Sequence, residues 1–325
     1  MVTSLGGSYG NALHAAVYRG HEETINNQGK IDVIASRGGH EAIATLLIDK
    51  GADVNAQGGF CGNALQASLY RGHEALVKLL IEKGADINTQ GGFYGNALQA
   101  ASYRGYEAMA RMLMKKGADV NLQGGCYGNA LQAALSGGHE TIAKLLIEKG
   151  ADVNAQGGEY RNALQAASCR GFEAIAKLLI EKGADVNAQG QHYENALYTA
   201  SNRGHEAIVK LLIEKGADVN AQGGDYGNAL QASSHRGYEA ITKLLLDKGA
   251  DVNAQGGHYG NALCAAIYQG HEAIIKLMMD KDAHINMVAM SDAPKASGKS
   301  LSFRPQNSDD FLKYQDNDDE GILDA

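Results

Sequence analysis

The sequence predicts an all-α solenoid in which one unit, a helix–turn–helix plus a β-turn, is repeated about eight times. Two short sequence markers support this prediction, because each recurs at intervals of 33 residues along the chain. The composition agrees, since 42 of the 325 residues are glycine and only 2 are proline. Both prolines lie beyond residue 290, so the repeated part of the chain contains none. We therefore expect a single kind of unit, stacked many times.

The two markers divide the chain into units. The first marker, Gly-Asn-Ala-Leu, and its two variants begin at Gly62, Gly95, Gly128, Arg161, Glu194, Gly227 and Gly260. The second marker, Gly-Ala-Asp-Val/Ile-Asn, begins at Gly51, Gly84, Gly117, Gly150, Gly183, Gly216 and Gly249. Together they predict a solenoid over residues 29–290, with repeats at 29–61, 62–94, 95–127, 128–160, 161–193, 194–226, 227–259 and 260–290.

Residue preferences within one unit predict where each helix begins and ends. Asn63 is a good N-cap for a first helix over residues 64–70, and Gly72 can end that helix in the left-handed conformation. A second helix is expected to begin at residues 73–74 and to end at Gly84. Its apolar stripe consists of Leu76, Leu79 and Leu80. Because two helices this short cannot bury their apolar faces alone, neighbouring units must stack.

Both ends of the chain depart from this pattern. Residues 1–28 are expected to form a truncated or irregular repeat, which fits a frayed cap, a true deletion or an error in the gene model. In the unit that follows, the first helix is predicted to be degraded to Lys30–Ala35. Residues 291–325 contain both prolines, five serines and the acidic run 316–320. This composition predicts a disordered acidic tail.

Composition and charge argue against several classes of protein. The net charge of −8 gives no reason to expect nucleic acid or an anionic membrane as the partner. No apolar run approaches the ~18–20 residues that span a bilayer, and residues 1–14 lack the features of a signal peptide. The four cysteines form no C-x-x-C pair and are expected to be reduced. We therefore expect an intracellular protein, cytoplasmic or nuclear, and we expect it to be monomeric.

Two motif matches invite a catalytic or metal-binding interpretation, but neither has the required context. Residues 293–300 match a relaxed phosphate-binding loop, yet too few residues follow it to form a nucleotide-binding sheet. The dipeptide His-Glu recurs along the chain, but no copy has the second histidine four residues later that a zinc protease requires. These histidines are instead expected to pack near the turn. Since a catalytic site needs one unique constellation and every candidate here is repeated, the sequence predicts no enzyme, no cofactor and no metal.

If the repeated residues hold the units together, the variable positions are the candidates for contact with a partner. One variable column precedes each first marker and consists of Phe60, Phe93, Cys126, Glu159, His192, Asp225 and His258. A second closes the first helix of each unit and is followed by an arginine column. Tyrosine and arginine are enriched at the energetically important positions of protein interfaces. The predicted partner-binding residues are Phe60, Phe93, Tyr70, Arg71, Tyr103, Arg104, Arg170, Arg203, His235 and Arg236.

These columns also have structural interpretations, which remain open at this point. Loop tips can vary without touching a partner, and an arginine at a helix C-terminus favours the helix dipole even when it binds nothing else. A further column of tyrosines recurs unchanged, which indicates packing between the turns. It consists of Tyr94, Tyr127, Tyr160, Tyr193, Tyr226 and Tyr259.

The repeated unit resembles the ankyrin repeat, whose 33 residues have a T-P-L-H-x-A-A-x-x-G-H core and a G-A-D-V-N ending. Over residues 96–105 the core here reads Asn-Ala-Leu-Gln-Ala-Ala-Ser-Tyr-Arg-Gly, with Asn, Ala and Gln in place of the family's Thr, Pro and His. The Gly-Gly-x-Tyr-Gly-Asn-Ala-Leu-Gln variant is similar to the arrays of fungal proteins, some of which carry a NACHT-type nucleotide-binding module upstream. The resemblance covers about residues 6–290 and implies an ankyrin solenoid.

The resemblance and the variable columns together predict a protein–protein interaction scaffold or adaptor that binds an unidentified protein through the first-helix face and the turn tips. Two alternatives remain open. In one, the chain is a regulator of transcription or signalling, with the acidic tail as effector. In the other, it is a detached sensor array of a fungal immune-type protein.

Overall fold

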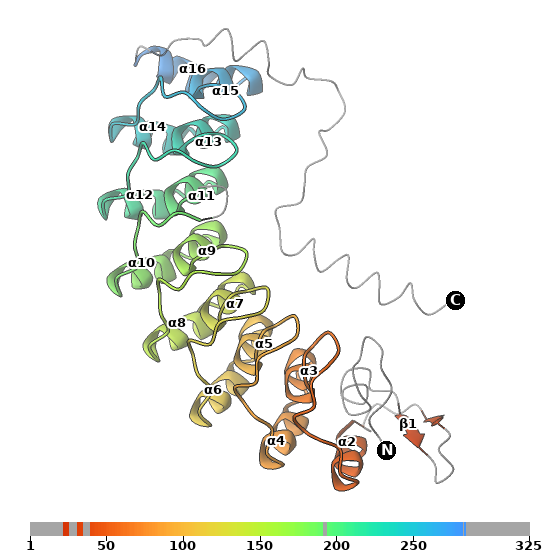
Figure 1. The fold of residues 1–325 in the computed structure, drawn as a ribbon. Coiled ribbons are helices and arrows are strands. Elements are labelled where there is room, and N and C mark those ends of the chain that lie inside the picture. The colour runs from red at the N-terminus through yellow and green to blue at the C-terminus, as the bar shows by residue number, and fades with distance from the viewer. Residues whose placement is uncertain (1–21, 26–30, 35–39, 191–193, 282, 284–325) are drawn as a thin grey trace.

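The structure is a computed structural model that describes residues 22–25, 31–34, 40–190, 194–281 and 283. Within these residues, helices α2 to α16 form a curved stack of helix pairs (Figure 1). The first helix of each pair and the hairpin before it lie on the concave side, whereas the second helix lies on the convex side (Figure 1). Most of the irregular N-terminal segment and the predicted tail, 291–325, lie outside the described residues.

Each pair from α3–α4 to α15–α16 combines a first helix of seven or eight residues with a second helix of eight or nine, and α2, of ten residues, precedes them without a described first helix. The first helices are α3 (Ala64–Arg71), α5 (Ala97–Arg104), α7 (Ala130–Ser136), α9 (Ala163–Arg170), α11 (Ala196–Arg203), α13 (Ala229–Arg236) and α15 (Ala262–Gln269). The second helices are α2 (His40–Asp49), α4 (Glu74–Glu82), α6 (Glu107–Lys115), α8 (Glu140–Glu148), α10 (Glu173–Glu181), α12 (Glu206–Glu214), α14 (Glu239–Asp247) and α16 (Glu272–Met279).

The helix boundaries predicted from the caps are confirmed. Asn63 Oδ1 accepts a hydrogen bond from the backbone N–H of Gln66 at 2.8 Å, and Gly72 ends α3 with a φ of 78°. Helix α4 begins at Glu74, whose carboxylate forms an i,i+4 ion pair with Lys78 at 2.7 Å. Every first helix from α3 to α15 begins after an asparagine that caps it in the same way. The repeated tetrad therefore marks the start of a helix.

Over residues 31–34, where the structure describes this segment, the degraded first helix expected at Lys30–Ala35 is not formed. The structure instead has an antiparallel pair of strands, in which β1 (Glu22–Ile25) pairs with β2 (Ile31–Ile34). The segment Ile-Asp-Val-Ile is rich in β-branched residues, which favour strands over helices. The prediction of helix was therefore wrong at this point, whereas the described array from α2 onwards is helical.

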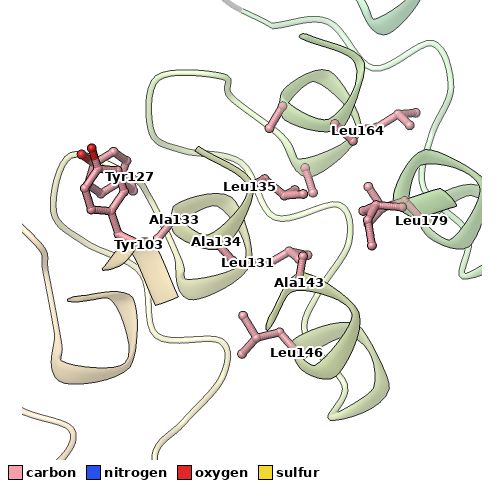
Figure 2. Packing of buried hydrophobic residues seen from close by; sticks show 14 of the residues in the cluster. Tyr103, Tyr127, Leu131, Ala133, Ala134, Leu135, Ala143, Leu146, Leu164 and Leu179 are labelled. Carbon is pink, nitrogen blue, oxygen red and sulfur yellow. The ribbon is translucent and has the colours of Figure 1, made fainter. Parts of the chain in front are cut away.

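One continuous hydrophobic core runs through the stack. The first helices are almost entirely buried because each lies between its neighbours, and their many alanines allow close approach. Figure 2 shows how leucines from successive helices meet between the units; those labelled include Leu131, Leu146, Leu164 and Leu179. Because each unit is covered by the next, the core belongs to the array and not to any single unit.

A ladder of asparagine side chains connects successive units at the loops that follow the second helices. Asn121 is representative: its Nδ2 donates to the carbonyl of Gly150 at 3.2 Å, and its Oδ1 accepts from the N–H of Asp152 at 2.8 Å. The same two bonds to the next unit are made by Asn55, Asn88, Asn154, Asn187 and Asn220. The ladder explains the second marker, since its Gly and Asp bind the previous unit while its Asn binds the next.

Glutamines of the first helices make a second series of bonds, on the concave side. Gln132 is buried, and its Nε2 donates to the carbonyl of Ala155, in the loop that ends its own unit, and to that of Arg161 in the next unit, at 3.0 and 3.1 Å. Equivalent pairs of bonds are made by Gln66, Gln99 and Gln231. Within the described residues, Gln165 donates only to the carbonyl of Glu194, at 2.6 Å. Four of the described glutamines therefore make the full pair of bonds, and Gln165 makes one of them.

Candidate protein-binding face

The predicted partner-binding residues lie on the concave side of the array. We use the term concave face for the described members of the variable columns, which run from Phe60 to His258 at the hairpin tips and from Tyr70 to Gln269 at the ends of the first helices. Figure 1 shows that the hairpins and the first helices line this side along the whole stack. The face is therefore extended, and each unit contributes its own side chains to it.

The two phenylalanines predicted at the hairpin tips lie against each other. The Phe60 and Phe93 ring centroids are 4.8 Å apart with an interplanar angle of 21°, and both rings meet the buried Tyr94 ring edge-on. The N–H of Phe93 also donates to the carbonyl of Phe60 at 2.8 Å, which joins the two hairpins. Both phenylalanines are half-buried, so part of each ring faces solvent.

The two predicted tyrosines have different surroundings. Tyr103 is only 6 % exposed and stacks on Tyr127, with ring centroids 4.3 Å apart. Figure 2 shows these two rings stacked, with their hydroxyl oxygens pointing away from the leucines. Tyr70 is half-buried, and the guanidinium groups of Arg104 and Arg71 lie 4.8 and 5.6 Å from its ring centroid. Tyr70, Arg71 and Arg104 are therefore accessible at the surface, whereas Tyr103 is buried.

The arginines of the C-terminal half contact the preceding unit. A terminal nitrogen of Arg170 donates to the carbonyl of Ser136, and Arg236 Nε donates to Asn202 Oδ1 at 2.9 Å. Arg170, Arg203 and Arg236 are all half-buried. At least two members of the arginine column therefore help to join the units, in addition to any role at the surface.

The middle of the concave face is polar and carries both signs of charge. Glu159 stands at a hairpin tip, and desolvation raises the pKa of its carboxyl group. The positive charges of Arg170 and Arg203 act in the opposite direction and lower it. These three residues form a mixed cluster, unlike the aromatic surface around Tyr70.

His235 belongs to an aromatic stack that the sequence did not reveal. Its ring lies 4.3 Å from that of Tyr226 and 5.1 Å from that of Tyr259. Its Nε2 lies 3.2 Å from the hydroxyl of Tyr259 and 2.8 Å from Nε2 of Gln269. Tyr226 and Tyr259 belong to the tyrosine column that recurs unchanged. The only sign of the stack in the sequence was that these two tyrosines, from adjacent units, lie on either side of position 235.

Acidification is expected to weaken the array through this stack. Burial, together with the charges of Arg236, His271 and His258, lowers the pKa of His235 from 6.5 to about 4. Between these values the unfolded chain binds the proton more readily, so this contribution to stability falls as the pH drops from about 6.5 towards 4. Urea unfolding at several pH values should show a smaller fall for His235→Phe, which keeps an aromatic ring but cannot be protonated. An equal fall in both proteins would contradict this.

The histidines of the His-Glu dipeptides have the structural role expected of them. Nε2 of His139, His205 and His271 lies 2.9–3.1 Å from a backbone carbonyl oxygen in the first helix of the preceding unit. Each histidine also directly precedes a second helix. These side chains therefore connect neighbouring units.

The described residues contain little else that suggests chemistry. The four cysteines are free thiols, and burial raises the pKa of Cys61 and Cys126 to about 12, which leaves both protonated at neutral pH. In the part of the chain that the structure describes, no three His, Cys, Asp or Glu side chains gather in a way that could hold a metal ion. Nor does any described helix have both the length and the apolar character needed to cross a membrane.

Comparison with protein families identifies a match described as ankyrin repeats (3 copies). The matched segments are residues 32–124, 65–157, 99–190, 130–223, 188–256 and 222–289. Comparison with curated proteins finds no match. Ankyrin repeats serve in general as protein–protein interaction modules, on a scaffold that is not itself enzymatic. The matched segments overlap and extend over most of the helical array, and the chain therefore belongs to the ankyrin-repeat family.

Proposed function

We propose that the protein is a scaffold or adaptor that binds a protein partner through its concave face and catalyses no reaction. The general role of ankyrin repeats supports the binding of a protein. The chemical difference between the two sides of the array supports the choice of face.

The single observation on which this choice rests is that aromatic rings gather beside arginines on the concave side of the N-terminal units, whereas ion pairs mark the convex side. The concave face presents half-buried rings of Phe60, Phe93 and Tyr70 beside exposed arginines. The convex side of the same units instead presents i,i+4 ion pairs, Glu74–Lys78 and Glu107–Arg111, at 2.7 Å each. Aromatic residues and arginine are enriched in interfaces, whereas lysine and glutamate are depleted.

Site-specific photocrosslinking tests this proposal. A photoreactive phenylalanine analogue is placed at Phe93 or His258 on the concave face, and at the exposed Lys78 or Lys243 on the convex side. After irradiation in a cell lysate, we expect discrete protein adducts from the concave positions and few from the convex ones. Adducts formed equally from both sides, or only from the convex side, would overturn the proposal.

A further inference from the structure

The N-terminal end of the concave face differs in chemistry from the rest. We call Phe60, Phe93, Tyr70, Arg71 and Arg104 the N-terminal patch. The three rings are half-buried, and the two arginines are exposed. All five residues come from adjacent units, so the patch combines an apolar surface with two positive charges.

Contacts within the patch hold it in place before any partner binds. Phe60 and Phe93 stack at 4.8 Å and are joined by a backbone hydrogen bond. Beneath them lies the fully buried ring of Tyr94, which also contacts Tyr70 at 5.0 Å. Arg104 lies over the Tyr70 ring at 4.8 Å. A surface ordered in advance loses little side-chain freedom on binding, which favours affinity.

The charge of the patch has one sign. From Phe60 to Cys126, the tip, helix-end and arginine columns contain two arginines and no acidic residue. Further along the same columns, Glu159 and Asp225 place carboxylates at the hairpin tips. The N-terminal patch is thus a cationic, aromatic region on a chain whose net charge is −8.

We propose that the N-terminal patch binds an acidic segment of a partner protein that carries an aromatic or aliphatic side chain between its carboxylates. This inference rests on the proposed function and names the chemistry of the partner. The apolar side chain packs on Phe60 and Phe93, and the carboxylates bind Arg71 and Arg104. A guanidinium that covers a ring uses its flat face, whereas its N–H donors lie in its plane, where a carboxylate can bind two of them.

Single-stranded nucleic acid is the other polyanion that such a surface could attract. Bases bind to proteins by stacking on exposed ring faces. Here Phe60 and Phe93 each cover one face of the other, and Tyr94 is fully buried, so fewer ring faces are left on which bases could stack. The geometry therefore favours an acidic polypeptide.

Fluorescence anisotropy with labelled probes and the full chain tests the proposal. The probes are a peptide with a central Phe-Leu flanked by glutamates, its counterpart with lysines in place of the glutamates, its counterpart with Ala-Ala in the centre, and an oligouridylate. We expect the glutamate peptide to bind best. Because exposed ion pairs are weak individually, Arg71→Gln/Arg104→Gln should lower its affinity about tenfold at low salt, and much less at high salt.

A matched control changes the same charge in the same two units. Lys78→Gln/Arg111→Gln removes two exposed cations from the convex side and should leave binding of the glutamate peptide unchanged. The apolar requirement is measured with the Ala-Ala peptide, so no ring of the protein needs to be removed. Equal binding of the glutamate and lysine peptides, an equal loss in the control, or tighter binding of the oligouridylate would overturn the proposal.

The two proposals fail in distinguishable ways. If adducts form at the concave positions but the glutamate peptide does not bind, the acidic segment is the wrong partner chemistry and the proposed function stands. If the concave positions give no preferential adducts, the proposed function itself is overturned.

Discussion

Replacing Gly128 with alanine is expected to lower the free energy of unfolding by about 2–4 kcal/mol. Gly128 has a φ of 85°, a left-handed conformation that is unfavourable for any residue with a Cβ atom. The added Cβ would also lie 2.7 Å from the carbonyl carbon of Gly157 and would collide with Gln132 Oε1. The backbone of the next hairpin would have to move, and its contacts with the preceding unit would weaken.

Gly150→Ala is the matched control because it also places a Cβ on a left-handed residue but causes no steric clash. Gly150 has a φ of 87°, yet a Cβ built on it would meet nothing within 4 Å. Its substitution should therefore cost only about 1 kcal/mol. Urea denaturation of the two variants measures the difference directly. Equal losses would show that the close approach between hairpins contributes nothing to stability.

The chain contains a natural case that supports this reasoning. Arg161 occupies the position equivalent to Gly128, and it keeps a positive φ of 65°. The hairpin facing it is changed, since Gly190 lacks the φ of about 150° that its described counterparts share. Those counterparts are Gly58, Gly91, Gly124, Gly157, Gly223 and Gly256. At Arg161, a side chain with a positive φ is thus accommodated opposite a hairpin whose glycine adopts another conformation.

The features that the sequence predicted correctly are local or strictly periodic. The cap at Asn63 and the helix end at Gly72 depend on residues within one turn, so a single unit was enough to place them. The strand at Ile31–Ile34 was missed because the repeat register suggested a helix, whereas the local β-branched residues favour a strand. Where the register and local preference disagreed, local preference was the better guide.

The candidate site could be predicted only in outline, because contacts between units decide what each side chain does. Tyr70 and Tyr103 occupy the same position in adjacent repeats, yet Tyr103 is buried and stacks on Tyr127 at 4.3 Å, whereas Tyr70 is half-buried and meets Tyr94 at a tilt, at 5.0 Å. Arg104 and Arg236 likewise occupy equivalent positions in their repeats. Both lie over a tyrosine ring, but Arg104 is exposed, whereas Arg236 is half-buried and donates to Asn202 of the preceding unit. Such differences depend on which residue the neighbouring unit places beside each side chain. A column of equivalent positions does not show that residue.

The glutamine bonds were also missed by the sequence analysis, and they lead to the second large effect. Gln132→Glu is expected to lower the free energy of unfolding by about 3–5 kcal/mol at pH 8. The change is nearly isosteric, but it replaces a donor with a negative acceptor that faces two carbonyl oxygens, those of Ala155 and Arg161. Gln132 is only 2 % exposed, so water cannot compensate for the lost bonds.

The pH dependence of this variant distinguishes the buried charge from a simple loss of packing. Burial and the facing carbonyls should raise the pKa of the new carboxyl group, and a protonated carboxyl can again donate one hydrogen bond. The deficit should therefore shrink as the pH is lowered from 8 towards 5. Gln156→Glu is the control, since Gln156 is exposed and its bond to the carbonyl of Asn154 can be replaced by water. A deficit that is the same at both pH values would mean that the lost stability reflects shape alone, and that the glutamine series is not held by its hydrogen bonds.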